Sequence, residues 1–281
     1  LVPRPSYPLF GYLAALESVG VLHYPLHYDG QWHLAIEDLE QAATPRTRAV
    51  IVVSPNNPTG SFLGREEAQR LRHLCAAREW ALVADEVFAD YVLTDDARRP
   101  PCMAEDSAAL TFSLGGLSKS CALPQLKLAW IAVAGPADAR EEALARLEVV
   151  ADTYLSVSTP VQLAAPALLS RTAELQRPVV ERVRANLAEL RRQVAGSAAT
   201  VLDLEGGWSA VLRLPASWPD EQWALTLLER DGVLVHPGYF FDFAQEACVV
   251  LSTLAAPDVF AQGVGRLVAR VEAGAEGPAA L

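Results

Sequence analysis

Four short apolar segments in the first half of the chain limit the folds that it can adopt. They are RAVIVVSP (48–55), WALVADEV (80–87), ALTFSLGG (109–116) and LKLAWIAVAG (126–135). Strands with one face in water alternate apolar and polar residues, whereas continuous apolar runs are typical of parallel strands covered on both faces. A segment with helical spacing of apolar residues, GREEAQRLRHLCAAREW (64–80), separates the first two runs. We therefore expect an α/β fold with a mostly parallel sheet that is covered on both faces.

The second half of the chain has a different pattern, in which segments with helical spacing come first and short strand-like segments follow. The expected helices are 136–155, 159–169, 177–196, 219–230 and 257–272, and the expected strand segments are 200–215, 232–241 and 247–254. We expect a large domain over residues 1–150, followed by linking helices and a smaller α+β C-terminal domain over residues 151–281.

The charge balance narrows the classes of partner. The 23 basic side chains are outnumbered by 34 acidic ones, which gives a net charge of −11. Nucleic acids and anionic membranes are bound through clusters of Lys and Arg, so we expect neither as a partner. No apolar run reaches the ~18 residues that a transmembrane helix needs. The N-terminal stretch LVPRPSYPLF also lacks the basic region followed by an apolar one that marks a signal peptide.

The four cysteines, Cys75, Cys102, Cys121 and Cys248, are widely spaced along the chain. They form no C-x-x-C pair and no zinc-finger spacing, so the sequence predicts no metal site. Reduced thiols in or near the core are typical of cytosolic proteins, and we expect a cytoplasmic protein.

Polar residues follow three of the apolar runs, at the strand ends where open α/β sheets bind their ligands. Asn57 lies in SPNNPTG after the first run, Asp85 ends the second, and Ser118 and Lys119 follow the third. Each has an ordinary structural explanation, since NNPTG is a common turn and an acidic residue can cap a helix. GGLSKS lacks the spacing of a nucleotide-binding phosphate loop. Only the combination of the three indicates a ligand site.

Lysine occurs at two positions only, Lys119 and Lys127, and every other basic residue of the chain is arginine. An ammonium group can lose its proton and then act as a nucleophile or form a Schiff base, which a guanidinium does not do. Two solvated surface lysines are the alternative explanation. The use of lysine alone does not decide between these two explanations, and the surrounding motifs have to decide.

A series of motifs in one order resembles the class I and II aminotransferases, the fold-type I enzymes that depend on pyridoxal 5′-phosphate (PLP). The motifs are PRPSYPLF (3–10), SPNNPTG (54–60), ADEVFADY (84–91), GLSKSCALPQLKLAW (116–130) and VLVHPGYFF (233–241). The resemblance implies the fold-type I transferase fold. It also implies a reaction that moves an amino group between an amino compound and a keto acid through a Schiff base on Lys119.

The residues that match the family's motifs have the chemistry that PLP requires. Lys119 matches the lysine that forms the Schiff base, is displaced by the substrate amine and then moves a proton. Asp85 matches the carboxylate that pairs with the pyridine nitrogen, and Asn57 matches the amide that donates to the phenolic oxygen.

The resemblance also implies contacts to the cofactor's ring and phosphate. Tyr7 in PSYP falls where the family stacks an aromatic side chain on the ring, although a core tyrosine is the alternative. Ser118 matches a hydroxyl ligand of the phosphate. Lys127 falls where the family usually has arginine, and it can neutralise a phosphate as a point charge without a bidentate fork.

Four features depart from the family's pattern. Phe88 replaces a tyrosine that bonds the phenolic oxygen, and Gly116 replaces a serine that contacts the phosphate. Val250, in the stretch Val250-Leu251-Ser252, stands where many members carry the arginine that binds the substrate carboxylate. Trp208 is a candidate lining residue for an apolar substrate group, or else a core residue. Finally, the family's N-terminal portion, with its first large-domain strand and phosphate-binding turn, does not precede PRPSYP, and we expect this chain to be a fragment.

Three functional hypotheses follow. The first is a PLP-dependent aminotransferase that acts on a small amino donor and a keto acid, and that forms a homodimer when complete. The second is a lyase, decarboxylase or racemase of the same fold. Val250 favours this hypothesis, because it stands where many aminotransferases carry the arginine that binds the substrate carboxylate. The third is a non-catalytic PLP-binding domain of a transcription regulator.

Overall fold

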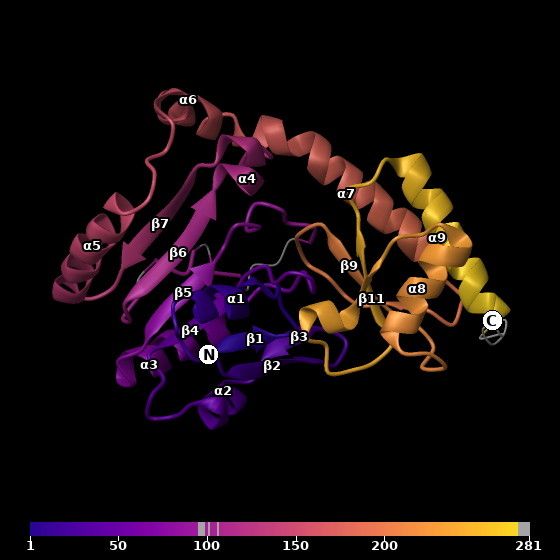
Figure 1. Ribbon diagram of the computed structural model, residues 1–281, viewed down its shortest axis with the longest axis horizontal. Coiled ribbons are helices and arrows are strands. Elements are labelled where there is room, and N and C mark those ends of the chain that lie inside the picture. The colour runs from indigo at the N-terminus through magenta and orange to yellow at the C-terminus, as the bar shows by residue number, and fades with distance from the viewer. Residues whose placement is uncertain (95–98, 101, 106, 275–281) are drawn as a thin grey trace.

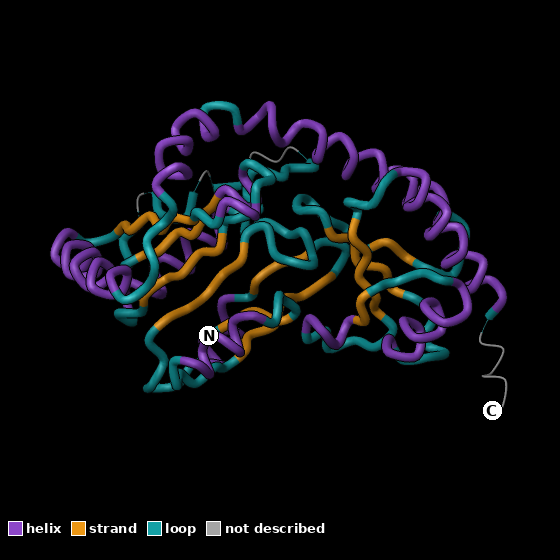
Figure 2. The backbone as a smooth tube through the Cα atoms, turned by 45° about the horizontal axis from the view of Figure 1, so that its top comes forward, coloured by secondary structure: helices purple, strands orange, loops and turns teal. Residues whose placement is uncertain are grey.

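The computed structural model describes residues 1–94, 99–100, 102–105 and 107–274. The chain forms three sheets that are flanked by helices (Figure 1). A long helix, α7 (Thr172–Val194), runs from the region of the first sheets to the C-terminal sheet, and Figure 2 shows the same path from a second direction.

The central sheet contains the four apolar runs, in the order β4-β5-β6-β7. Its strands are β4 (Ala49–Val53), β5 (Ala81–Asp85), β6 (Thr111–Gly116) and β7 (Ala129–Ala134). The first three are parallel and β7 is antiparallel to β6. The helix between the first two strands is α3 (Arg65–Ala77), which buries Leu71 and Cys75 against the sheet. The expected α/β fold with a mostly parallel sheet is confirmed.

The expected cover on both faces is wrong for β7. Its first four residues are exposed or nearly so, including Trp130 at 37% and Ile131 at 47%. Among the described residues, β7 has β6 as its one partner in the sheet, so it is an edge strand. Apolar composition predicts a strand here correctly, but it does not report what packs against that strand.

The N-terminal segment adds a small mixed sheet beside β4. Its strands are β1 (Val2–Arg4), β2 (His23–Tyr28) and β3 (Trp32–Leu34), with β1 parallel and β3 antiparallel to β2. Two helices accompany them, α1 (Leu9–Leu16) and α2 (Ile36–Ala42). The main-chain N–H of Ile51 donates to the carbonyl of Leu1 over 2.8 Å, which fixes the start of the chain against the central sheet.

The C-terminal part is an antiparallel sheet packed against helices. The strands are β8 (Thr200–Val201), β9 (Ser209–Arg213), β10 (His236–Pro237) and β11 (Cys248–Ser252), and the helices are α8 (Asp220–Asp231) and α9 (Pro257–Ala273). Their shared core includes Leu212, Trp223 and Leu267, each fully buried. The expected strand 232–241 is mostly wrong, because after β10 the chain turns into the 3-10 helix η2 (Gly238–Phe241).

Three helices follow β7 where the sequence predicts helices, although their bounds differ from the predicted ones. Helix α5 (Ala137–Asp152) ends before Tyr154, α6 (Thr159–Leu169) matches its prediction, and α7 begins before the expected position and contains Pro178. Near its start, α7 donates from Gln176 Nε2 to the carbonyl of Ser120 over 2.7 Å. Further along, Asn186 Nδ2 donates to the carbonyl of Thr253 over 2.9 Å. Helix α7 therefore contacts both the Lys119 segment and the C-terminal sheet.

Candidate active site

Asp85 is the last residue of β5, at the edge of the central sheet where the parallel strands end. It lies opposite Val53 of β4, and its main-chain carbonyl accepts a bond from the N–H of Ser54 over 2.9 Å. Burial raises the pKa of its carboxyl group, while a bond from the N–H of Val87 and the charge of Lys119 lower it, and the neighbouring Glu86 raises it again. Asp85 is thus a half-buried carboxylate at a strand end, where a cationic partner favours its charged form.

Lys119 lies in the single-turn helix α4 (Leu117–Ser120), which follows β6 at the same edge of the sheet. Burial lowers the pKa of its ammonium group, and the charge of Asp85 opposes that effect. The Nζ atom lies 5.1 Å from the ring centre of Trp208 and 5.4 Å from that of Phe88. A desolvated lysine loses its proton more readily than an exposed one, and this is a common way of preparing an amine for nucleophilic chemistry.

Asn57 lies in the turn after β4, and its neighbour Asn56 holds that turn. Asn56 is 3% exposed; its Nδ2 donates to Pro5 O over 3.0 Å and to Thr59 Oγ1 over 2.9 Å. Its Oδ1 accepts from Ser6 Oγ over 2.8 Å. Because Pro5 and Ser6 precede Tyr7, the same residue brings the Tyr7 segment and the Asn57 turn together.

The side chain of Asn57 has capacity for a ligand. Its Oδ1 accepts a 3.4 Å bond from Ser209 Oγ on β9, and its Nδ2 has no partner among the residues that the structure describes. A cavity beside it, of about 10 Å³, is lined by Asn57, Phe88, Trp208 and neighbouring turn residues. Asn57 therefore faces the same aromatic side chains as Lys119.

The remaining predicted residues lie around this centre. Tyr7 is 47% exposed and lies two residues before α1, next to the Asn56 turn. Ser118 is half-buried beside Lys119. Lys127 is exposed, and it makes no hydrogen bond or ion pair with any described residue; its following neighbour Leu128 accepts a 3.0 Å bond from the N–H of Leu117. The main chain thus places Lys127 near the start of α4.

Three aromatic side chains enclose one side of Lys119. Trp208 packs edge-on against Phe88, with ring centres 4.7 Å apart, and against Tyr91, with ring centres 5.0 Å apart. The hydroxyl of Tyr91 donates to the main-chain carbonyl of Lys119 over 2.8 Å. Phe88, at the position where the resemblance leads one to expect tyrosine, therefore contributes a ring face instead of a hydroxyl.

Val250 lies in an apolar environment. It is 3% exposed in β11, in a cluster with Leu202, Val211 and Phe241. The position that carries an arginine in many members of the resembled family is therefore part of the packing between β9 and β11 here.

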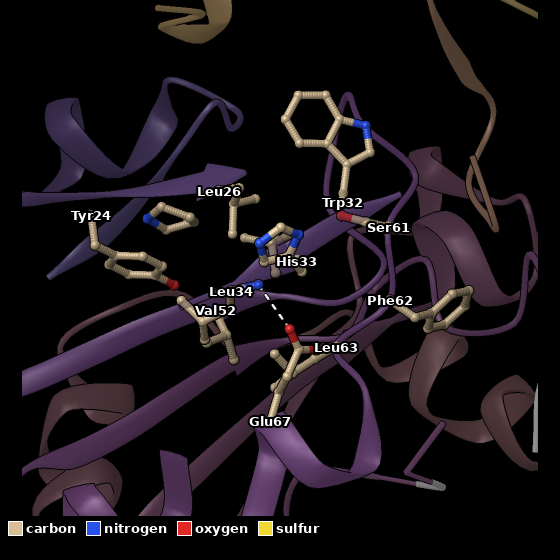
Figure 3. Close-up of a pocket in the computed structure, with 12 residues that line it drawn as sticks. Tyr24, Leu26, Trp32, His33, Leu34, Val52, Ser61, Phe62, Leu63 and Glu67 are labelled. Atoms are coloured by element: carbon tan, nitrogen blue, oxygen red, sulfur yellow. Dashed lines mark hydrogen bonds between the residues drawn. The ribbon is translucent and has the colours of Figure 1, made fainter. Parts of the chain in front are cut away.

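A separate pocket lies between the β2–β3 hairpin and the start of α3 (Figure 3). Glu67 closes it, because its carboxylate accepts from the N–H of Leu34 over 2.8 Å and from that of Gly64 over 2.6 Å. Its volume of about 20 Å³ suits a water molecule and nothing larger. This pocket is a packing feature and not a substrate site.

Comparison with known proteins decides the family. The family described as aminotransferase class I and II matches residues 1–259. The chain belongs to this family. It is 30% identical over 164 residues to glutamate–pyruvate aminotransferase AlaA of Escherichia coli, a match that covers 58% of this chain and 40% of that protein. It is 33% identical over 176 residues to nicotianamine aminotransferase A of Hordeum vulgare, covering 61% of this chain and 38% of that one.

The fold of solved aminotransferases agrees as well. The structure of an alanine aminotransferase from Pyrococcus furiosus superposes with a TM-score of 0.86 at 19% identity, covering 97% of this chain and 70% of that one. The matched region spans about two fifths of the length of the curated relatives. The fold-type I architecture that the motifs imply is thereby confirmed.

Members of this class I and II family use PLP. The residues present fit that group, because three donor and acceptor types that it needs meet at one edge of the sheet. They are the amide of Asn57, whose Nδ2 has no partner among the described residues, the carboxylate of Asp85 and the half-buried amine of Lys119. Ser118 and Lys127 add a hydroxyl and a cation from the segment that carries the amine.

Two residues that shape this candidate site were missed from the sequence. Asn56 carried a signal, since two consecutive asparagines before a proline suggest that one of them organises the turn. Tyr91 carried none, because its bond to Lys119 joins segments that no local pattern relates.

The described residues contain no helix long and apolar enough to cross a membrane. All four cysteines are free thiols, three of them buried and Cys102 half-buried.

Proposed function

We propose that this chain is the cofactor-binding part of a PLP-dependent aminotransferase that moves an amino group between an amino compound and a keto acid. The observation that carries the proposal is the placement of Lys119 beside Asp85 at the ends of β5 and β6, with Asn57 on the adjoining turn. The names of the relatives support an amino donor and a keto acid as the two substrates.

Each residue has a role that its environment supports. When bound, PLP supplies an aldehyde for covalent attachment and a conjugated ring that accepts electrons from the substrate carbon. Asp85 would hold a proton on the ring nitrogen, and Asn57 would donate to the phenolic oxygen. Lys119 would attach the cofactor, and its amine would then carry a proton to and from the substrate carbon.

The remaining roles concern binding. Tyr7 would stack on the ring, and its exposed side chain is available for that contact. Ser118 would bond the phosphate as a hydroxyl donor. Lys127 would neutralise the phosphate as a point charge, which its exposed position and lack of a described partner support.

We further propose that the complete protein is a cytoplasmic homodimer whose large domain includes residues 1–150 and whose linking helices and small domain include residues 151–281. Free cysteines support a reducing compartment. Separate apolar cores around Leu82 and around Leu212 support the division.

Covalent trapping tests the proposal directly. The chain is incubated with PLP and reduced with borohydride, and peptide mass spectrometry locates the adduct. We expect the adduct on Lys119 in the wild-type chain and no adduct at that position in Lys119→Ala. We expect Lys127→Ala to keep the adduct but to bind PLP roughly tenfold more weakly, because it loses one charge-assisted contact. Equal adduct in the Lys119→Ala protein rules out the assignment. Transfer of amino groups that depends on a keto acid, measured against release of ammonia, separates the aminotransferase from a lyase.

A further inference from the structure

Helix α4, which carries Lys119, is too short to fix the lysine by itself. It has a single turn of four residues, and a single helical turn has little intrinsic stability. Its last carbonyl groups also lack partners within the helix. Contacts from other elements must therefore determine where the amine lies.

Two distant side chains supply those contacts. Gln176 of α7 bonds the carbonyl of Ser120 over 2.7 Å, and Tyr91 bonds the carbonyl of Lys119 itself over 2.8 Å. Tyr91 is 0% exposed, so its hydroxyl donates from within the core to the half-buried Lys119 segment. Burial raises the pKa of the Tyr91 hydroxyl to about 12, so it remains a donor across the pH range in which proteins are studied.

Tyr91 also fixes the aromatic wall that faces the lysine. Its main-chain carbonyl accepts a 2.9 Å bond from the N–H of Gly207, and its ring packs 5.0 Å from that of Trp208. Next to it, Val92 forms an antiparallel bridge with Gly206. The turn that precedes β9 is thus attached to the same residue that holds the lysine's backbone.

We propose that Tyr91 is a positioning residue for Lys119, which holds the lysine's main chain through its hydroxyl and the facing Trp208 wall through its ring and carbonyl. This inference rests on the proposed function of Lys119. Tyr91 thereby keeps the Lys119 amine in surroundings of low polarity. Without the hydroxyl bond, the main chain of α4 relaxes and Nζ moves away from the rings of Trp208 and Phe88.

The chain contains a matched control for the loss of one buried hydroxyl. Tyr24 is 1% exposed, and it donates to the main-chain carbonyl of Ile51 over 2.7 Å. Tyr24→Phe removes the same kind of bond as Tyr91→Phe, in the core under β4 and not at the lysine. A purely structural role for Tyr91 predicts that the two variants behave alike.

The test is competitive labelling of the cofactor-free chain with trace acetic anhydride over a range of pH. Mass spectrometry measures the acetylation of Lys119, and the acetylation of Lys127 in the same sample corrects for the amount of reagent. We expect the midpoint of the Lys119 labelling profile to move to higher pH in Tyr91→Phe. At a pH below the midpoint, the labelling of Lys119, expressed as a fraction of its high-pH plateau, then falls about threefold or more compared with the wild-type chain. Tyr24→Phe keeps the wild-type midpoint.

Replacement of Tyr91 by p-aminophenylalanine keeps a hydrogen-bond donor at the same place. It provides a second test if the Tyr91→Phe variant does not fold. We expect this variant to show the wild-type midpoint. Two results would overturn the positioning role. One is a Lys119 midpoint displaced to higher pH in the p-aminophenylalanine variant, and the other is the same Lys119 midpoint in Tyr91→Phe and Tyr24→Phe. Failure of the proposed function is a different result, namely the absence of a borohydride-fixed PLP adduct on Lys119 in the wild-type chain.

Discussion

Asp85 and Lys119 favour each other's charged forms against the effect of burial. Burial raises the pKa of the carboxyl group and lowers that of the ammonium group, and in each case the partner's charge opposes the change. The two residues end β5 and follow β6, which are neighbouring parallel strands. The sheet itself therefore sets the electrostatic environment of the amine.

Removing the carboxylate should make Lys119 easier to deprotonate. In Asp85→Asn the burial effect is no longer opposed, so the pKa of Lys119 falls further, and the midpoint of its labelling profile moves to lower pH. Labelling of Lys119 at neutral pH, relative to Lys127, then rises. Asp242→Asn is the control, because Asp242 pairs with Arg4 at 3.3 Å elsewhere and its loss leaves the midpoint unchanged. A midpoint that moves upward in Asp85→Asn contradicts the pairing.

Two adjacent asparagines should give opposite phenotypes. Asn56→Ala deletes three buried side-chain bonds, and we expect it to lower the free energy of unfolding by roughly 2–4 kcal/mol. Asn57→Ala deletes one long bond, and we expect a loss below about 1 kcal/mol together with weaker retention of PLP. Urea unfolding of the cofactor-free chain measures the first effect, and PLP titration measures the second. Equal stability losses in the two variants would show that the division of roles is wrong.

The contact between two turns should not tolerate a methyl group. Gly60 has a φ of +71°, and a Cβ there would lie 2.6 Å from the carbonyl oxygen of Gly206. We expect Gly60→Ala to lower the free energy of unfolding by roughly 2–4 kcal/mol, through strain and overlap. In helix α9, a Cβ on Gly263 would meet no atom within 4 Å, and we expect Gly263→Ala to stabilise by about 0.5–1 kcal/mol. Urea midpoints test both, and a neutral Gly60→Ala refutes the tight contact.

The sequence predicted most elements of this fold. Continuous apolar runs identify β4, β5 and β6 because a buried parallel strand needs apolar residues on both faces. They also identify β7, but its exposed face could not be predicted, since exposure depends on what packs against a strand. The segment 232–241 was misread because two residues of β10 and one turn of η2 leave too little periodicity to separate strand from turn.

The site was predictable where a strand end carries the chemistry. Asn57, Asp85 and Lys119 each follow or end an apolar run, and the topology of a parallel sheet then brings them to one edge. The residues that support them come from other segments. Tyr91 reaches the Lys119 carbonyl and Ser209 reaches Asn57 across 28 and 152 residues of sequence, respectively, so only the folded chain reveals these bonds.

The close approach of Gly60 and Gly206 has a mechanical consequence. The N–H groups of Glu205 and Gly206 both donate to the carbonyl of Gly60, over 3.1 and 2.8 Å, with no space left for side chains between the two turns. The Asn57 turn and the Trp208 turn are therefore joined through main-chain atoms at this point. Their spacing here does not depend on the rotamer of any side chain, so the backbone itself defines the distance between these two walls of the cavity beside Asn57.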